Sequence, residues 1–142
     1  MKKISSQILL LALCLSCIFA FVSCSKTQPE GLWENALYNE DTTLGEGAKT
    51  VTVEFEMQEK TITFSLKTDK STVGEALLDC GLIEGEEGAY GLYIKKVNGV
   101  TADYDVDQSY WAFYENGEYG LTGVDLTEID PDVAYSFVQT KD

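Results

Sequence analysis

Two alternating stretches constrain the fold more than any other feature of this sequence. In residues 51–57, Val, Val, Phe and Met alternate with Thr and Glu, and in residues 61–67, Ile, Phe and Leu alternate with Thr, Ser and Lys. A period of two puts all the apolar side chains on one face of a strand. Gln58 and Glu59 separate the stretches, so we predict a two-stranded hairpin with one buried face. That face needs a second layer to cover it.

The segment after this hairpin predicts a helix. Thr72 and Glu75 have the spacing of a capping box, and Gly81 is the expected stop. The apolar residues between them recur at intervals that share one helical face: Val73, Ala76, Leu77 and Cys80. We therefore expect the helix to lie across the sheet with Cys80 buried. The chain has no His to serve as a base, so Cys80 is not a candidate nucleophile.

The second half of the chain returns to strands. We predict them at Tyr90–Val97, Tyr110–Glu115 and Val133–Val138, with tight turns at Asn98-Gly99 and Asn116-Gly117. The middle stretch carries aromatic residues on both faces, which is typical of a central strand. The order strand, strand, helix and three strands predicts an α+β domain, with one helix packed on a β-grasp-like mixed sheet.

The first 23 residues have the pattern of a lipoprotein signal peptide. Two lysines follow Met1, an apolar run extends from residue 8 to 22, and a small residue precedes Cys24. Residues 21–24, Phe-Val-Ser-Cys, resemble a bacterial lipobox. We therefore expect lipidation at Cys24 and a location on the extracytoplasmic face of a bacterial cell membrane. Lipidation at Cys17 and a soluble secreted form remain open alternatives.

Residues 24–47 are interpreted as a tether and a docking arm ahead of a domain at residues 48–142. The arm, Gly31–Glu40, contains Trp33 and other apolar residues that an unstructured tether would not usually carry, so we expect it to dock on the domain. The glycine-rich, acidic stretch Asp41–Lys49 predicts a connector.

The charge of the chain excludes several classes of function. There are 24 acidic residues against 10 basic ones, a net charge of −14 at pH 7. So few cations argue against binding nucleic acid, and the acidic surface argues against docking on anionic lipid headgroups. Zinc sites are disfavoured because the chain has no His.

Two acidic clusters were weighed as calcium sites. Asp103, Asp105 and Asp107 alternate as in the first half of a calcium loop, but Gln108 and Tyr114 stand where glycine and glutamate are expected. This stretch and the cluster at residues 84–87 are predicted to be solvated acidic turns. We predict no metal site and no required cofactor. Nucleophile elbows, phosphate loops and cofactor fingerprints are also missing from the sequence, so a binding protein is expected rather than an enzyme.

From about residue 49 to 138 the chain resembles a small bacterial domain of unknown function. That domain is similar to the C-terminal domain of the vitamin B12 carriers transcobalamin and intrinsic factor. The resemblance rests on Thr72-Val-Gly-Glu-Ala-Leu-Leu, Tyr90-Gly-Leu-Tyr-Ile-Lys-Lys-Val-Asn-Gly-Val100, Tyr110-Trp111, Leu121-Thr-Gly-Val-Asp125, Asp132 and Phe137. In those carriers the domain covers one face of the corrinoid, and a larger helical barrel grips the rest. The resemblance implies a small-ligand binding module with a corrinoid as the leading candidate.

The expected ligand site lies beside the end of the aromatic strand. Aromatic rings there offer a flat apolar surface, and the following loop offers an apolar contact, a hydroxyl and a glycine. The predicted ligand-binding residues are Tyr93, Trp111, Tyr114, Leu121, Thr122 and Gly123. A role of Trp111 in the core alone remains open. The alternative function is a surface module that recognises a protein or peptide, through a strand edge, without a small ligand.

Overall fold

The structure is a computed structural model that describes residues 31–142. The predicted signal peptide, Cys24 and the first part of the tether lie outside the described residues. Within the described part, no helix has the length and apolar character needed to cross a membrane.

Short strands dominate residues 31–142, where helices are few and brief. The helical segments are η2 (Gly31–Asn35), α2 (Val73–Asp79), α3 (Tyr104–Asp107) and η3 (Val124–Leu126). The strands are β1 (Thr42–Gly45), β2 (Lys49–Met57), β3 (Lys60–Thr68), β4 (Ile83–Gly88), β5 (Gly91–Val97), β6 (Val100–Thr101), β7 (Ser109–Glu115), β8 (Glu118–Tyr119) and β9 (Tyr135–Lys141).

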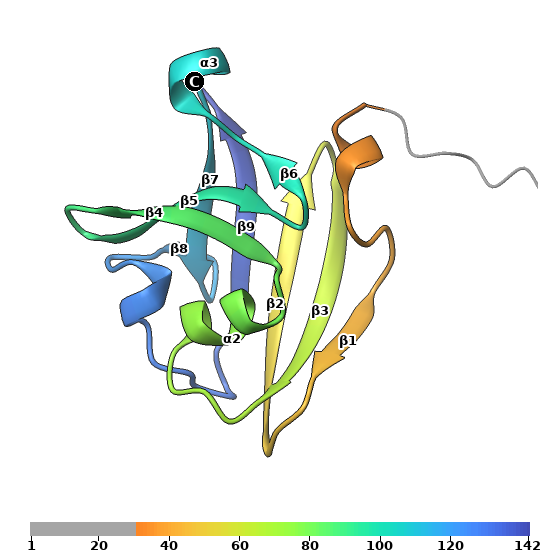
Figure 1. Ribbon diagram of the computed structural model, residues 1–142, viewed down its shortest axis with the longest axis vertical. Coiled ribbons are helices and arrows are strands. Elements are labelled where there is room, and N and C mark those ends of the chain that lie inside the picture. Colours follow the sequence, from red (N-terminus) through yellow and green to blue (C-terminus); the bar gives the residue numbers. More distant parts are fainter. Residues whose placement is uncertain (1–30) are drawn as a thin grey trace, which may run out of the picture.

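The larger sheet has six strands in the order β1-β3-β2-β9-β7-β8 (Figure 1). The predicted hairpin is confirmed as β2 and β3, which pair antiparallel from Lys49↔Thr68 to Met57↔Lys60. β9 pairs parallel with β2 and antiparallel with β7, so the sheet is mixed, as predicted. The last strand in the sequence therefore lies inside the sheet and joins its two halves.

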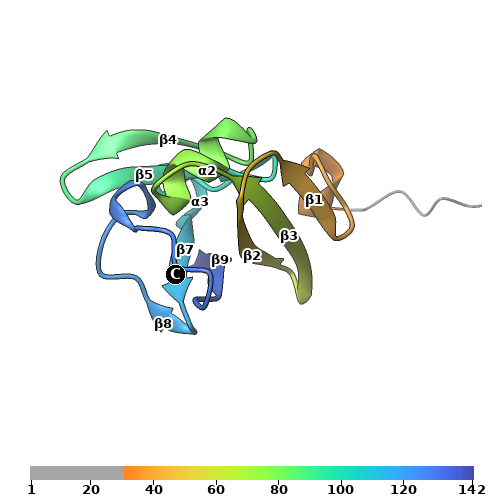
Figure 2. The ribbon, with the colours of Figure 1, turned by 90° about the horizontal axis from the view of Figure 1, so that it is seen from below.

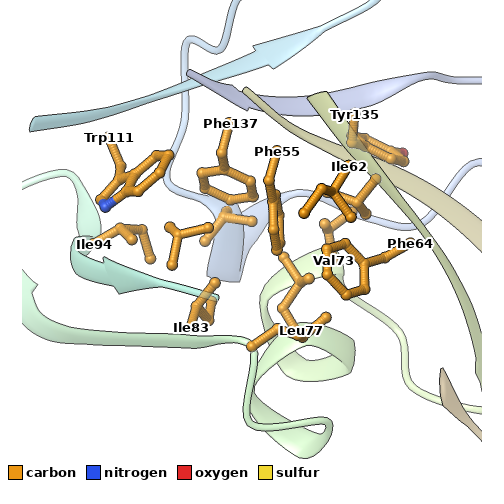
Figure 3. Packing of buried hydrophobic residues seen from close by; sticks show 14 of the residues in the cluster. Phe55, Ile62, Phe64, Val73, Leu77, Ile83, Ile94, Trp111, Tyr135 and Phe137 are labelled. Carbon is orange, nitrogen blue, oxygen red and sulfur yellow. The ribbon is translucent and has the colours of Figure 1, made fainter. Parts of the chain in front are cut away.

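The second sheet has three strands in the order β4-β5-β6. Together with α2 it forms a layer over one face of the larger sheet (Figure 2). The core lies between the layers, where Phe55 and Phe137 from the larger sheet meet Leu77 of α2 and Ile83 of β4 (Figure 3). The α+β class is confirmed, whereas the single sheet of a β-grasp is not, because the described strands divide between two sheets.

The helix α2 begins at the predicted capping box. The Thr72 hydroxyl accepts a hydrogen bond from the Glu75 N–H, and the Glu75 carboxylate accepts from the N–H groups of Thr72 and Ser71. These backbone bonds lower the pKa of Glu75. The helix lies close to η3, because a Cβ at Gly74 would stand 2.7 Å from Cα of Asp125.

The arm docks on the domain, as predicted. Trp33 is 6% exposed, and its indole N–H donates to the Met57 carbonyl at 3.0 Å. The Tyr38 ring meets the Phe64 ring edge-on, with 5.7 Å between centroids. The Asn98 amide bonds both the N–H and the C=O of Tyr38. The arm is thereby fixed to both layers.

Three expectations about local structure were wrong. The predicted connector contains β1, which pairs parallel with β3 along its full length. The acidic stretch at residues 84–87 is part of β4, although its side chains are exposed as expected. Asp103 caps the short helix α3 by accepting from the Asp105 N–H, so this stretch is more ordered than a plain turn. In each case backbone pairing or capping, rather than buried side chains, sets the structure.

Candidate ligand-binding cleft

A cleft of about 380 Å³ opens between three segments of the chain. These are the turn between β4 and β5 with the first half of β5, the strand β7, and the loop that links β8 to η3. Both ribbon views show these segments on the side of the molecule away from β1 (Figures 1 and 2). Its volume lies within the range of small-molecule sites. The lining residues are Gly88, Ala89, Tyr90, Gly91, Leu92, Tyr93, Ile94, Tyr110, Trp111, Phe113, Tyr119, Gly120, Leu121, Thr122, Gly123 and Val124.

The inner part of the cleft belongs to the hydrophobic core. Ile94 and Trp111 are each 7% exposed and lie near one another at one end of the core (Figure 3). The indole N–H of Trp111 donates to the Val100 carbonyl at 3.1 Å. Trp111 therefore serves the core and lines the cleft at the same time, and its polar atom is not free for a ligand.

The outer part of the cleft is apolar and unusually exposed. Leu121 is 95% exposed, Tyr90 88% and Tyr119 61%. Tyr93 is 42% exposed. Scattered exposed apolar residues are common, but a group gathered around one concavity is characteristic of a binding surface.

Backbone contacts hold the two walls of the cleft together. The Gly123 N–H donates to the Tyr90 carbonyl at 3.2 Å. The Asp125 carboxylate accepts from the Leu92 N–H at 2.7 Å, which ties η3 to β5. A Cβ added at Gly123 would stand 3.0 Å from Cα of Gly91. The walls approach this closely because both facing residues are glycines.

The structure brings most of the predicted site residues together. Tyr93, Trp111, Leu121, Thr122 and Gly123 all line the cleft. Tyr114 does not line it, and its ring instead packs edge-on against Tyr119 at 5.7 Å. Gly123 also lets the two walls approach, because its missing side chain leaves room for Cα of Gly91.

Four important residues were not singled out from the sequence: Tyr90, Gly91, Tyr119 and Asp125. Three of them stand within the stretches that carry the family resemblance, which was the available signal. Nothing in those stretches indicates that Asp125 reaches the Leu92 N–H, because this contact joins residues 33 positions apart.

None of the residues that line the cleft is charged. Burial is the largest cause of a raised pKa at Tyr110, so its phenol is neutral at neutral pH. Among residues 31–142, no group of three His, Cys, Asp or Glu side chains is arranged to hold a metal ion. The cleft therefore offers shape, aromatic surface and hydroxyl groups, and it lacks an acid–base pair.

Cys80 lies outside the cleft, at the C-terminal end of α2. It is half-buried rather than buried as predicted, and its Sγ would lie 3.4 Å from a Cβ at Gly45 of β1. Burial is the main cause of the raised pKa of its thiol, with a smaller contribution from the Asp79 carboxylate.

Residues 70–132 match a family described as a domain of unknown function, DUF4430. No curated protein matches the chain. The crystal structure of a proposed metal-binding protein from Ruminococcus gnavus ATCC 29149 is similar with a TM-score of 0.62 and 31% identity, and the match covers 67% of this chain and 99% of that one.

Haptocorrin, solved in complex with Cbi (cobinamide), is a more distant match. Its TM-score is 0.53 and its identity 18%, and the match covers 65% of this chain. This likeness shows a shared fold. The chain spans only 25% of the length of haptocorrin.

Proposed function

The chain belongs to the same family as the Ruminococcus gnavus protein, and from this premise and the cleft we propose that it is a binding module for a small, partly apolar ligand. The observation that carries the proposal is the uncharged cleft with an exposed apolar rim. Leaving Leu121 and Tyr90 almost fully in water gives the folded domain little stability, so a bound partner is the natural reason for their position.

A corrinoid is the leading candidate for this ligand. Its ring system is flat and largely apolar, and its amide arms need hydrogen-bond partners such as hydroxyls and backbone groups. Thr122 and the tyrosines supply hydroxyls, and the glycine-rich walls expose backbone. The fold shared with haptocorrin supports this candidate.

The description of the Ruminococcus gnavus protein as metal-binding fits the same proposal. A corrinoid carries its own cobalt within the macrocycle, so a protein can hold that metal without ligating side chains of its own. The described residues offer no such cluster of ligands. We propose a binding module and not an enzyme.

A cleft of about 380 Å³ is too small to enclose a whole corrinoid. The module would cover one edge or face, and the rest of the ligand would contact water or a second protein. This matches a chain that corresponds to a quarter of haptocorrin.

The alternative, peptide recognition at a strand edge, has weaker support. β4 is the longest edge strand of the smaller sheet, and its outer edge pairs with no other described strand. However, it carries Glu84, Glu86 and Glu87 and has an irregular register between Glu84 and Gly85. Charges and bulges are features that protect an edge from strand addition.

The test of the proposed function is a titration with cobinamide and cobalamin. We expect saturable quenching of tryptophan fluorescence, after inner-filter correction, with calorimetry as a second readout. Leu121→Ala and Thr122→Ala should weaken binding by roughly fivefold to thirtyfold, because each removes one contact worth about 1–2 kcal/mol. Leu121 and Thr122 are both exposed, so the melting temperatures of the two variants should stay close to that of the wild-type protein.

Leu126→Ala is the matched control, since Leu126 is 62% exposed on the same segment but does not line the cleft. Its affinity should equal that of the wild type. Unchanged fluorescence and no heat with either corrinoid would remove the corrinoid from consideration. Binding that both loop variants retain in full would show that the ligand occupies another site.

We also propose that the mature protein is anchored by lipid at Cys24 on the extracytoplasmic face of a bacterial membrane. Metabolic labelling with a fatty acid should mark the wild-type protein, and Cys24→Ala should abolish the label. Label that persists in this variant would assign the anchor to another cysteine, such as Cys17.

A further inference from the structure

We infer that the cleft selects its ligand by charge: it accepts planar cations and neutral molecules and rejects anions. This inference rests on the cleft proposed above as the ligand site, and it adds a rule about the class of molecule that enters. It depends on the aromatic lining, on the distribution of acidic side chains next to the lining residues, and on the positions of the two lysines in β5.

The lining favours cations through its aromatic rings. Four tyrosines and Trp111 contribute to it, and no lysine does. The face of an aromatic ring carries negative partial charge, so it attracts a cation within about 6 Å of its centroid. Such a contact contributes most when water is partly excluded, as at the inner end of the cleft beside Trp111.

Three glutamates neighbour lining residues in the sheet or in the chain. Glu86 pairs across the strands with Tyr93, and Glu87 pairs with Leu92 on the other face of the hairpin. In β8, Glu118 directly precedes Tyr119. All three glutamates are exposed, and their formal negative charges contribute to the electrostatic potential near the entrance.

The two lysines that follow the lining residues in β5 have acidic partners. Lys95 lies 5.4 Å from the centroid of the Tyr93 ring, and its ammonium group is 3.9 Å from Asp103. Lys96 is 3.1 Å from Glu84 across the hairpin. An anion entering the cleft would therefore meet no lysine among the lining residues. It would instead approach the carboxylates of Glu86, Glu87 and Glu118.

Two dyes of similar size and opposite charge test the inference without any corrinoid. Thioflavin T is a planar cation, and 8-anilinonaphthalene-1-sulfonate is an aromatic anion. At about 20 mM salt, we expect saturable thioflavin T fluorescence and at least roughly tenfold weaker binding of the anionic dye. At about 500 mM salt, where the Debye length falls to roughly 4 Å, the difference should narrow.

Variants assign the effect to the cleft and its rim. Tyr119→Ala should weaken thioflavin T binding, whereas Leu126→Ala should leave it unchanged. The triple variant Glu86→Gln, Glu87→Gln, Glu118→Gln should bring the two dyes closer in affinity with little change in melting temperature, because all three residues are exposed.

Four results would overturn the inference: equal or tighter binding of the anionic dye, no binding of thioflavin T, binding that Tyr119→Ala leaves unchanged, or a preference that the triple variant retains in full. The proposed function is judged separately by cobinamide. If the dyes show charge selection but cobinamide does not bind, the corrinoid is rejected as the ligand and the charge selectivity stands. If cobinamide binds but the dyes show no charge selection, the charge selectivity is rejected and the corrinoid stands.

Discussion

Replacing Gly91 by alanine is expected to destabilise the protein by roughly 2–5 kcal/mol and to abolish binding in the cleft. Gly91 has φ +111°, a conformation that residues with a Cβ rarely adopt. The new Cβ would also stand 2.7 Å from the Asp125 carboxylate and 3.1 Å from Cα of Gly123. Moving Asp125 away would break its bond to the Leu92 N–H. The two walls of the cleft would then separate.

Gly117→Ala is the control that isolates the steric part of this effect. Gly117 also has a positive φ, +80°, but no atom lies within 4 Å of a Cβ built there. This variant should lose only about 1–2 kcal/mol of stability and keep its ligand affinity. Urea unfolding of the three proteins measures the difference. Equal losses in the two variants would show that the contact between the walls does not limit stability.

Trp33→Ala is expected to lower the free energy of unfolding by about 3–5 kcal/mol, the usual effect of deleting a buried tryptophan. The side chain is 6% exposed, bonds the Met57 carbonyl and lies under the Lys60 ammonium at 4.6 Å from the ring centroid. Without it the arm should detach from β2 and β3, and proteolysis should remove the arm first.

Two variants separate the causes of the Trp33 effect. Trp33→Phe keeps most of the apolar contact but leaves the Met57 carbonyl without its donor, so a loss of roughly 1–3 kcal/mol is expected. Leu37→Ala, at a residue 59% exposed on the same arm, should change stability by less than about 0.5 kcal/mol. A wild-type unfolding curve for Trp33→Ala would mean that the arm contributes nothing to the fold.

The sequence predicted those elements whose structure depends on nearby residues. The alternation in residues 51–67, the Thr72–Glu75 capping box and the Asn-Gly turns each fix local backbone geometry, and the structure has all of them. The docking of the arm was also predictable, because Trp33 is too apolar to remain in water. These are short-range effects that a single sequence displays directly.

The remaining features depend on partners far away in the chain. β1 has the sequence Thr-Thr-Leu-Gly inside a glycine-rich, acidic stretch, and it pairs with the edge of β3, which lies more than 15 residues further along the chain. In the larger sheet, β9 pairs with β2 on one side and with β7 on the other. No local sequence pattern indicates which strands become its neighbours. In the cleft, aromatic character indicated Trp111 and Tyr93, but the same character at Tyr114 gave no sign that its ring would pack on Tyr119.

The central place of β9 determines when the sheet can form. Neither β2 nor β7 has its inner neighbour until residues 135–141 are available, so the amino-terminal and carboxyl-terminal parts cannot complete the sheet separately. Such long-range pairing slows folding, because a large loop must close before its contacts form. Until β9 is in place, the facing edges of β2 and β7 stay unpaired, and unpaired strand edges are sites where neighbouring chains can add and aggregate.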